Sequence, residues 1–207
     1  MAAADAVNPQ ASAAADTATA GPATLEQQLQ QAGLELLGNC QKLSGRGPAL
    51  LQHAALLEDF STQEIDTLGE AMLLVRARAG QVLIREGERG DWMLLLLSGT
   101  VDVSKATLAQ LAETETETER QSDLSRLAVI REGAALGEMS MFDSEVRYAT
   151  CTALDTVEAA LLSRAAIAKL IREHPGVGAK LVVKITQLLA QRLRNTSNQL
   201  VRMLEKK

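Results

Sequence analysis

Residues 80–103 read GQVLIREGERGDWMLLLLSGTVDV, and this stretch decides the fold. Two short apolar runs, Val82 to Ile84 and Met93 to Leu97, alternate with glycine-containing turns, and Val101 and Val103 then follow in strict alternation. Runs of this length bounded by turn residues are typical of β-strands. Because no helix separates them, the pattern predicts an antiparallel barrel or jelly roll rather than a parallel α/β sheet.

Strand texture returns after an interruption. Leu127 to Ile130 and Thr150 to Leu162 are again apolar and rich in β-formers, whereas Lys105 to Ser125 contains an alternating run of glutamate and threonine from Glu113 to Glu119. Like charges at this density would repel one another inside a core. We therefore predict that residues 105–125 form an acidic loop insertion, with docking or phosphorylation of its threonines as the alternative.

Helical spacing dominates on both sides of the strands. Leucines within Thr24 to Gln41 predict a helix capped by Thr24, Ala49 to Leu57 predicts a short helix, and Ser61 to Glu64 is a capping box. Beyond the strands, a helix from Arg164 to Glu173 is broken at a proline, and a second helix of about 28 residues begins at Val177.

The expected fold is therefore α+β: a β jelly-roll (double-stranded β-helix) barrel flanked by N-terminal helices and a long C-terminal helix. The expected organisation is a disordered lead at 1–23, a helical region at 24–60, the jelly roll at 61–163 and C-terminal helices at 164–207, with a dimerisation helix at the end.

Composition excludes several classes of protein. No window approaches the roughly 18 uninterrupted apolar residues of a membrane span, and the first 41 residues contain no Lys or Arg, which signal and transit peptides require. Cys40 and Cys151 are the only cysteines, too few for a disulfide framework or for a zinc or iron–sulfur site. We expect a cytoplasmic protein without a metal or cofactor.

Charge is distributed unevenly along the chain. The net charge is −5, yet residues 160–207 hold ten Lys and Arg residues against two acidic ones, Glu173 and Glu205. A basic segment can follow nucleic acid. The solvated face of an amphipathic helix carries the same residues, and we favour this simpler interpretation.

The most unusual segment is residues 136–153, LGEMSMFDSEVRYATCTA. Gly137 would let the backbone approach a ligand, and the N–H groups at the start of a helical turn from Glu138 to Phe142 would face an anion. Arg147 could add bidentate charge, while the carboxylate of Glu138 could accept a hydrogen bond from a sugar hydroxyl. A nucleotide carries both groups; the alternative for Glu138 and Arg147 is a solvated pair or a structural salt bridge.

These motifs, in this order, resemble the cyclic nucleotide-binding domain superfamily and its phosphate-binding cassette, over Ala49 to Leu204. The resemblance implies a jelly roll in which Glu138 binds the ribose 2′-hydroxyl and Arg147 binds the cyclic phosphate. Backbone N–H groups near Met139, Ser140 and Ala149 would complete the cradle. It further implies that Val103 and Leu136 pack on the purine. The residues that carry it are Gly80, Glu86-Gly87, Gly90-Asp91, Ser98-Gly99, Gly137-Glu138-Met139-Ser140 and Arg147-Tyr148-Ala149-Thr150.

Tyr148 departs from that pattern. It stands directly after the arginine, where the family usually has Ser, Ala or Thr, so the base preference is left open. Its bulk could crowd the pocket, or its ring could face outward as part of the surface.

The last helix adds a second resemblance. Residues 190–197, AQRLRNTS, are similar to the corresponding helix of the catabolite gene activator protein family. This implies that Thr196 contacts the base from its own subunit and Ser197 from the partner, which favours cAMP over cGMP. The alternative is two ordinary polar residues on a helix face.

Apolar positions on this helix recur at spacings of three and four, as in a two-helix coiled coil. They predict a parallel homodimer, with packing of the helix on its own barrel as the alternative. The positions are Val182, Ile185, Leu189, Leu193, Thr196, Leu200 and Met203.

No catalytic motif is visible, and His53 and His174 are the only imidazoles, at positions suited to a cap or a solvated residue. The chain stops at Lys207, too soon for a DNA-binding domain after the long helix. We expect a stand-alone cyclic nucleotide receptor, with no enzymatic activity and no nucleic-acid or membrane partner, that signals through its C-terminal helix to a dimer or an effector protein. The alternatives are an interaction protein without ligand and a regulatory subunit of an enzyme.

Overall fold

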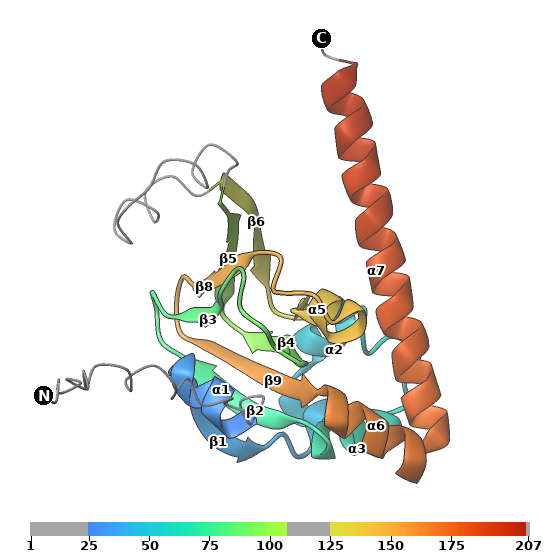
Figure 1. The fold of residues 1–207 in the computed structure, drawn as a ribbon. Coiled ribbons are helices and arrows are strands. Elements are labelled where there is room, and N and C mark those ends of the chain that lie inside the picture. Colours follow the sequence, from blue (N-terminus) through green and yellow to red (C-terminus); the bar gives the residue numbers. More distant parts are fainter. Residues whose placement is uncertain (1–24, 107–124, 206–207) are drawn as a thin grey trace, which may run out of the picture.

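Two antiparallel sheets lie face to face in the computed structural model, which describes residues 25–106 and 125–205 (Figure 1). One sheet has the strand order β1-β2-β9-β4-β7 and the other has the order β3-β8-β5-β6. The predicted α+β jelly roll is confirmed, as a sandwich of two sheets. The strands are β1 (Glu35–Asn39), β2 (Leu73–Ala77), β3 (Val82–Ile84), β4 (Trp92–Ser98), β5 (Thr100–Lys105), β6 (Ser125–Arg131), β7 (Ala135–Leu136), β8 (Thr150–Ala153) and β9 (Val157–Ser163).

Strand β4 explains why the apolar run from Met93 to Leu97 does not alternate. Side chains of successive residues point to opposite faces of a sheet, and both faces of this one are covered. Trp92, Leu94 and Leu96 enter the core between the two sheets, whereas Met93, Leu95 and Leu97 enter a second core under the helices. A central strand buried on both sides requires apolar residues throughout.

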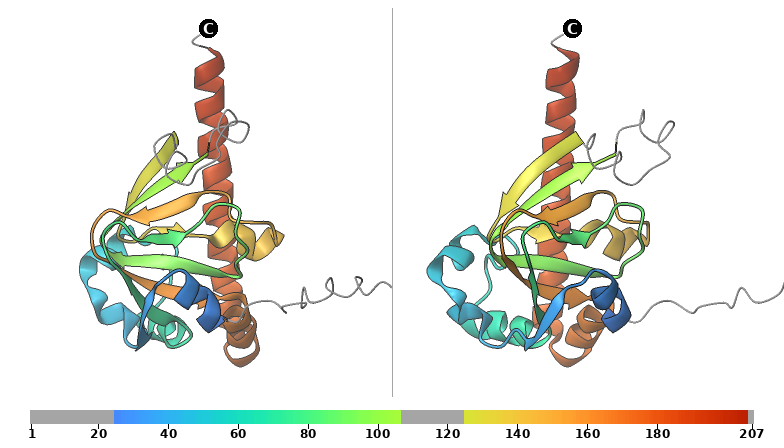
Figure 2. Two further views of the ribbon diagram at one scale, coloured as in Figure 1. Left: turned by 60° about the vertical axis from the view of Figure 1, so that its left-hand side comes forward. Right: turned by 90° about the vertical axis from the view of Figure 1, so that its left-hand side faces the viewer.

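Helices α2 (Pro48–His53), α3 (Thr62–Glu70), α6 (Arg164–Glu173) and α7 (Pro175–Leu204) cover the outer face of the β1-β2-β9-β4-β7 sheet, and α7 extends beyond the sandwich (Figures 1 and 2). Helix α1 (Leu25–Gln31) differs, because its Leu29 is buried in the core between the two sheets. The predicted capping box is present: the Ser61 Oγ accepts from the Glu64 N–H at 3.3 Å, and the Glu64 Oε2 accepts from the Ser61 N–H at 2.7 Å. The helices after α1 are the 3₁₀ turn η1 (Leu43–Arg46), α2 (Pro48–His53), α3 (Thr62–Glu70), α5 (Glu138–Asp143), α6 (Arg164–Glu173) and α7 (Pro175–Leu204).

The helix predicted over Thr24 to Gln41 is wrong in its second half. Helix α1 (Leu25–Gln31) ends early, and β1 follows from Glu35. Gly33 adopts φ +66°, and the Leu34 N–H donates to the Leu29 carbonyl, which is how a glycine closes a helix. Because β1 pairs with β2 along the open edge of the sheet, its leucines serve a strand rather than a helix face.

Two other predicted elements have different bounds in the structure. The helix predicted over Ala49 to Leu57 is shorter, as α2, and the strand texture over Thr150 to Leu162 divides into β8 and β9. Three predicted features lie outside the described residues: the lead at 1–23, the helix cap Thr24 and residues 107–124 of the acidic insertion.

The first half of α7 is anchored on the body of the protein. Ile185 is buried, and Val182 and Leu189 pack against the helix-side core. The Lys180 Nζ lies 2.7 and 2.8 Å from the two carboxylate oxygens of Glu64, and the Lys184 Nζ lies 2.5 Å from an Asp59 oxygen. The predicted dimer seam is therefore too long: its part from Val182 to Leu189 packs against the core of the same chain.

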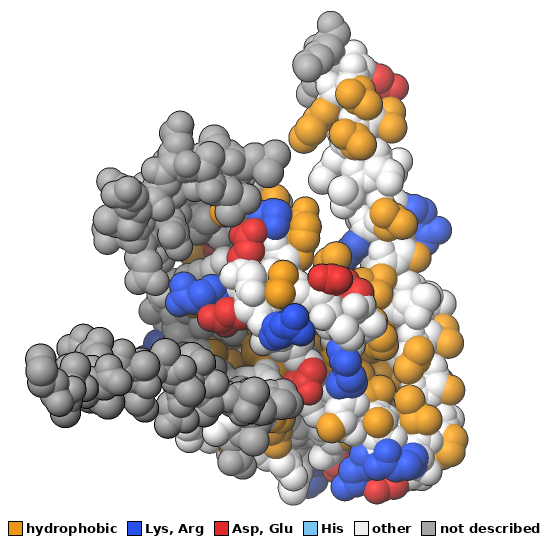
Figure 3. All heavy atoms as spheres, in the orientation of Figure 1, with side chains coloured by type: hydrophobic (Ala, Val, Ile, Leu, Met, Phe, Trp, Pro, Cys, Tyr) orange, Lys and Arg blue, Asp and Glu red, His pale blue; other side chains and the backbone are white. Residues whose placement is uncertain are grey.

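The distal half of α7, residues 193–204, is different. Leu193, Leu200 and Met203 are 69%, 57% and 69% exposed. Figure 3 shows apolar side chains gathered near the free end of this helix. Helix α7 is long but too polar to cross a bilayer. No other helix within the described residues is both long enough and apolar enough to do so.

Candidate functional site

The site is built on the chain from β7 to β8, here called the site segment (residues 136–150). Strand β7 pairs Leu136 with Leu94 of β4, and Gly137, at φ +74°, turns the chain into α5. A Cβ at Gly137 would lie 2.6 Å from the Arg147 Nη1 and 2.9 Å from the Ile84 Cδ1. Glycine is therefore required here both for its backbone conformation and for the space that it leaves.

Arg147 is a buried cation, with 3% of its surface exposed. Its Nη1 donates to the Gly137 carbonyl at 2.7 Å and to the Ser140 Oγ at 2.8 Å, and its Nη2 donates to the Trp92 carbonyl at 2.7 Å. Burial lowers the pKa of this guanidinium to about 10, so the group stays charged at neutral pH. No carboxylate among the described residues forms an ion pair with it. Its hydrogen-bond acceptors are neutral, so an incoming anion could form the ion pair that this cation lacks among the described residues.

Glu138 is a buried anion, with 1% of its surface exposed. Arg192 of α7 donates through Nη1 to the Glu138 Oε1, and through Nη2 to the Ala135 carbonyl at 2.5 Å. The Glu138 Oε2 is buried without any hydrogen-bond partner in the described part of the chain. An unsatisfied buried acceptor is costly, so this oxygen can gain a hydrogen bond from an incoming hydroxyl.

The backbone of Arg147 is tied to the turn after β3. The Arg147 N–H donates to the Glu88 carbonyl at 2.8 Å, and the Gly87 N–H donates to the Arg147 carbonyl at 2.9 Å. Near this turn, a Cβ on Gly90 would lie 2.5 Å from the Arg147 Nη2. Gly90 thus leaves room for an arginine that lies far from it in the sequence.

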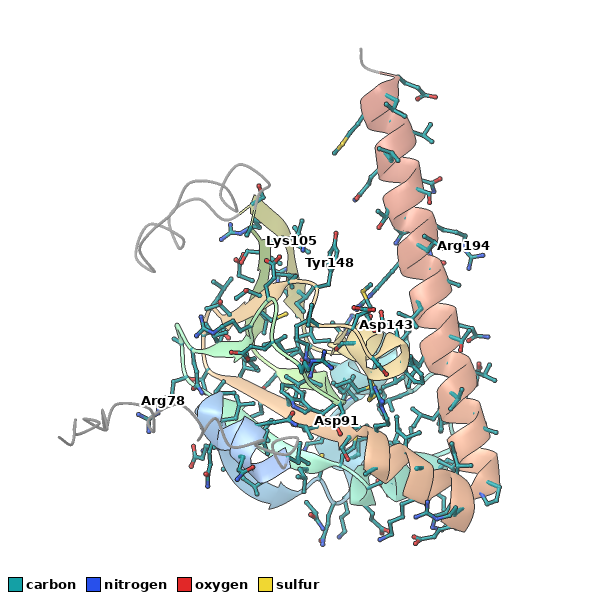
Figure 4. The ribbon with its side chains drawn as sticks, in the orientation of Figure 1. Arg78, Asp91, Lys105, Asp143, Tyr148 and Arg194 are labelled. Carbon is teal, nitrogen blue, oxygen red and sulfur yellow. The ribbon has the colours of Figure 1, made fainter. Side chains whose placement is uncertain are left out.

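Tyr148 does not fill the core of the sandwich. Its side chain is 57% exposed, and the Lys105 Nζ lies 4.0 Å from the centre of its ring. The same Nζ donates to the Tyr148 carbonyl at 2.7 Å and to the Glu86 Oε1 at 2.8 Å. Figure 4 shows Lys105 and Tyr148 side by side at the end of the β5–β6 ribbon. Of the two orientations considered from the sequence, the ring adopts the outward one.

The remaining predicted contacts divide into two groups. Leu136 is buried and Val103 is partly buried, and both border the core between the sheets, close to the site segment. Thr196 and Ser197, in contrast, are exposed on the distal half of α7. The structure therefore brings Gly137, Glu138, Ser140 and Arg147 together, whereas the two hydroxyl residues of α7 stand apart from them.

Three residues of the site were not predicted from the sequence as members of it. Arg192 precedes Thr196 by four positions, so it lies on the same helical face one turn closer to the body. Trp92, the only tryptophan of the chain, stacks on Arg147, with the Arg147 Cζ 4.4 Å from the ring centre. Gly90 leaves room for the same guanidinium. The helical spacing could have identified Arg192; no sequence signal connects Trp92 with Arg147.

Neither cysteine offers a reactive thiol. Both are buried, and burial raises the pKa of Cys151 to about 12. Within residues 25–106 and 125–205, no three His, Cys, Asp or Glu side chains are grouped so that they could hold a metal ion.

Comparison with known proteins points to one family. The family model described as "Cyclic nucleotide-binding domain" matches residues 74–174. The crystal structure of a cyclic nucleotide-binding domain from Methylobacillus flagellatus is 31% identical, with a TM-score of 0.66, and the match covers 84% of this chain and 89% of that one.

Curated relatives are more distant. A lysophospholipase nte1 of Aspergillus fumigatus is 28% identical over 176 residues, which is 84% of this chain and 9% of that protein. A CRP-like cAMP-activated global transcriptional regulator of Mycobacterium tuberculosis is 24% identical over 155 residues, which is 75% of this chain and 62% of that protein. The chain thus spans about a tenth of the lysophospholipases and less than two thirds of the regulator.

Proposed function

Because the chain belongs to the cyclic nucleotide-binding domain family, we propose that its site segment is a receptor site for a cyclic nucleotide, and for cAMP in particular. Arg147 holds the cyclic phosphate and Glu138 holds the ribose 2′-hydroxyl. Backbone N–H groups of Met139, Ser140 and Ala149 complete the cradle. The proposed role is to bind and to signal, without a chemical reaction.

One observation carries this proposal: the site contains two buried, complementary and incompletely satisfied charges. Arg147 has only neutral acceptors, and the Glu138 Oε2 has no donor among the described residues. A single ligand with an anionic group beside a hydroxyl meets both needs. A cyclic nucleotide has this arrangement, whereas inorganic phosphate would leave Glu138 unsatisfied and a nucleoside would leave Arg147 without its anion.

The signal passes through Arg192. The ribose hydroxyl and Arg192 compete for the same carboxylate, and Arg192 is the residue that ties the end of the anchored part of α7 to the site segment. A ligand that weakens this tie favours a different placement of the distal half of α7. Such a shift requires that the ligand bind one placement better than the other, and competition for Glu138 supplies that difference.

The distal half of α7 pairs with a second copy of the chain in this proposal. Leu193, Leu200 and Met203 are exposed at intervals of seven and three, as in a short coiled-coil seam. Thr196 lies within the same stretch, with Ser197 next to it. A parallel pairing brings these hydroxyls from both subunits near the two sites, where they contact the adenine.

A second role is favoured by a separate observation. The lysophospholipase relatives align with this chain over only 9% of their length, so in them the corresponding segment is a small part of a much larger protein. The same site could therefore regulate a larger enzyme, with the ligand unchanged and the effector different.

Thermal unfolding with and without nucleotide tests the proposal. A ligand present at 100 times its Kd stabilises the folded state by about 2.7 kcal/mol, which raises the Tm of a domain of this size by about 5 to 10 °C. We expect this shift with cAMP, a smaller shift with cGMP and none with cyclic di-GMP.

The matched variants are Arg147→Ala, which should abolish the shift, and Arg131→Ala on the exposed end of β6, which should retain it. Absence of any shift in the wild-type protein at millimolar nucleotide would reject the receptor and favour an interaction protein.

A further inference from the structure

The guanidinium of Arg147 rests on the indole ring of Trp92. Its Cζ lies 4.4 Å from the ring centre, and its Nη2 donates to the Trp92 carbonyl at 2.7 Å. Trp92 is 4% exposed and begins β4, where its backbone pairs with Ser163 of β9. The arginine is thus held on one side by an aromatic face, which attracts a cation and fixes the plane of the guanidinium.

Trp92 is itself fixed from the N-terminal side of the chain. Its indole Nε1 donates to the Gln28 Oε1 of α1 at 2.8 Å. A cavity of about 40 Å³, lined by Gln28, Trp92 and Arg147 among others, lies between α1 and the arginine. Two contacts therefore connect α1 to Arg147: the hydrogen bond from the Trp92 indole to the Gln28 amide, and the stacking of the Arg147 guanidinium on that indole.

Helix α1 lies outside the stretch that matches the family model, which begins at residue 74. Its connection to Arg147 therefore involves a part of the chain that the family model does not include. The arrangement is also consistent with the charge at the site: no carboxylate among the described residues forms an ion pair with Arg147, and the ring face of Trp92 adds to the neutral acceptors that stabilise the cation.

We propose that Trp92 is a positioning residue for Arg147, and that α1, through Gln28, sets how tightly the site holds a cyclic phosphate. This inference rests on the proposed function. Loss of the ring face removes one of the contacts that fix the plane of the guanidinium, so the group must be reoriented when the ligand binds. Movement of α1, by a partner or by the chain that precedes it, would then change affinity without touching the ligand.

The test compares four variants by calorimetric titration with cAMP, well below the Tm of each protein. Trp92→Leu removes the ring, and we expect a Kd about tenfold weaker. Trp92→Phe keeps a ring face but removes the N–H donor, and should recover part of the loss. Gln28→Leu should weaken binding about threefold, and Gln30→Leu, on the exposed side of α1, should bind as the wild type does.

A second readout is specific to positioning. Since Trp92 is the only tryptophan, the tryptophan fluorescence of the protein reports on the surroundings of this one ring, which include the stacked guanidinium and Gln28. We expect cAMP to change its emission in the wild type and in Gln30→Leu, with a smaller change in Gln28→Leu. A residue that merely stabilised the fold would alter the Tm without altering this response.

The outcomes separate the two proposals. If the wild-type protein binds no cyclic nucleotide, the proposed function fails and this inference fails with it. If the wild type binds but Gln28→Leu and both Trp92 variants retain its Kd, and Gln28→Leu also retains its fluorescence response, the receptor stands and the role of Trp92 and α1 is overturned. Gln28→Leu alters a half-exposed side chain, so it decides the question even where Trp92→Leu does not fold.

Discussion

Arg192 donates a hydrogen bond to the buried carboxylate of Glu138, and thereby joins the long helix to the segment that carries the candidate site. The two residues are 54 positions apart in the sequence. Arg192 also donates to the Ala135 carbonyl, so one guanidinium holds both the strand before the site and the acid within it. In the part of the chain that the structure describes, this is the last hydrogen bond between α7 and the body toward the C-terminus.

Removal of this guanidinium should loosen the end of α7. Arg192→Ala leaves Glu138 buried without a cation, and we expect a loss of about 2 to 3 kcal/mol in the free energy of unfolding. Amide hydrogen exchange of residues 193–204 should also become faster. The control is Arg194→Ala, because Arg194 is exposed and points away from the body in Figure 4. Equal exchange in the two variants would show that Arg192 does not hold the distal half.

Gly90 should be required for the position of Arg147. A Cβ there would lie 2.5 Å from the Nη2 and 2.8 Å from the Nε, so Gly90→Ala must displace the guanidinium. We expect a loss of about 1 to 3 kcal/mol in stability and a nucleotide-induced Tm shift reduced by at least half. Gly45→Ala serves as the control, since nothing lies within 4 Å of its added Cβ. A crystal structure of Gly90→Ala with Arg147 unmoved would contradict the prediction.

Tyr148 should not obstruct the ligand. Because its side chain is 57% exposed and lies against Lys105, Tyr148→Ala should change the Kd for cAMP less than about threefold and the free energy of unfolding by less than about 1 kcal/mol. Isothermal titration of both proteins provides the comparison. Binding that appears only in Tyr148→Ala would mean that the ring blocks the site.

Acid should weaken the ion pair between Glu64 and Lys180, which helps to hold the first half of α7 on the body. The hydrogen bond from Lys180, together with the one from Ser61, lowers the pKa of Glu64 from its ordinary value to about 2. A carboxylate whose pKa is lower in the folded state stabilises that state above its unfolded pKa of about 4.3, and this contribution is lost as the pH falls toward 2. Urea unfolding between pH 7 and pH 2 should show the loss.

Glu64→Gln should accordingly be less stable than the wild type at pH 7 and lose less stability on acidification. Glu70→Gln, at the exposed end of the same helix α3, is the control and should follow the wild-type pH profile. Parallel profiles for the wild type and Glu64→Gln would show that the ion pair with Lys180 contributes nothing.

Self-association should depend on the distal half of α7. Leu200→Glu places a charge in the exposed apolar stretch, and we expect it to convert a dimer into a monomer in sedimentation equilibrium at micromolar concentration. Val183→Glu changes an equally exposed apolar residue on the anchored half, and should leave the mass unchanged. A single-chain mass for the wild-type protein would exclude the homodimer.

Local patterns were sufficient for most elements of the fold. The apolar runs bounded by glycine predict β3, β4 and β5 with their turns, and the Ser61 capping box predicts the start of α3, because both signals depend on neighbours within a few residues. The exception is β1. Its leucines resemble a helix face, and only pairing with β2 along the sheet edge makes a strand the better conformation.

The candidate site likewise contains residues that are close in the sequence and contacts that only the tertiary structure creates. Gly137, Glu138 and Arg147 lie within one short segment, so the sequence alone could place them together and assign them to an anion and a hydroxyl. The stacking of Arg147 on Trp92 and the capture of Glu138 by Arg192 join residues 54 to 55 positions apart. Contacts of that range depend on how the sheets and α7 pack, and no local periodicity encodes them. For the same physical reason, only the folded structure shows that the apolar residues in the first half of α7 pack against the core of the same chain, whereas those in the distal half are exposed.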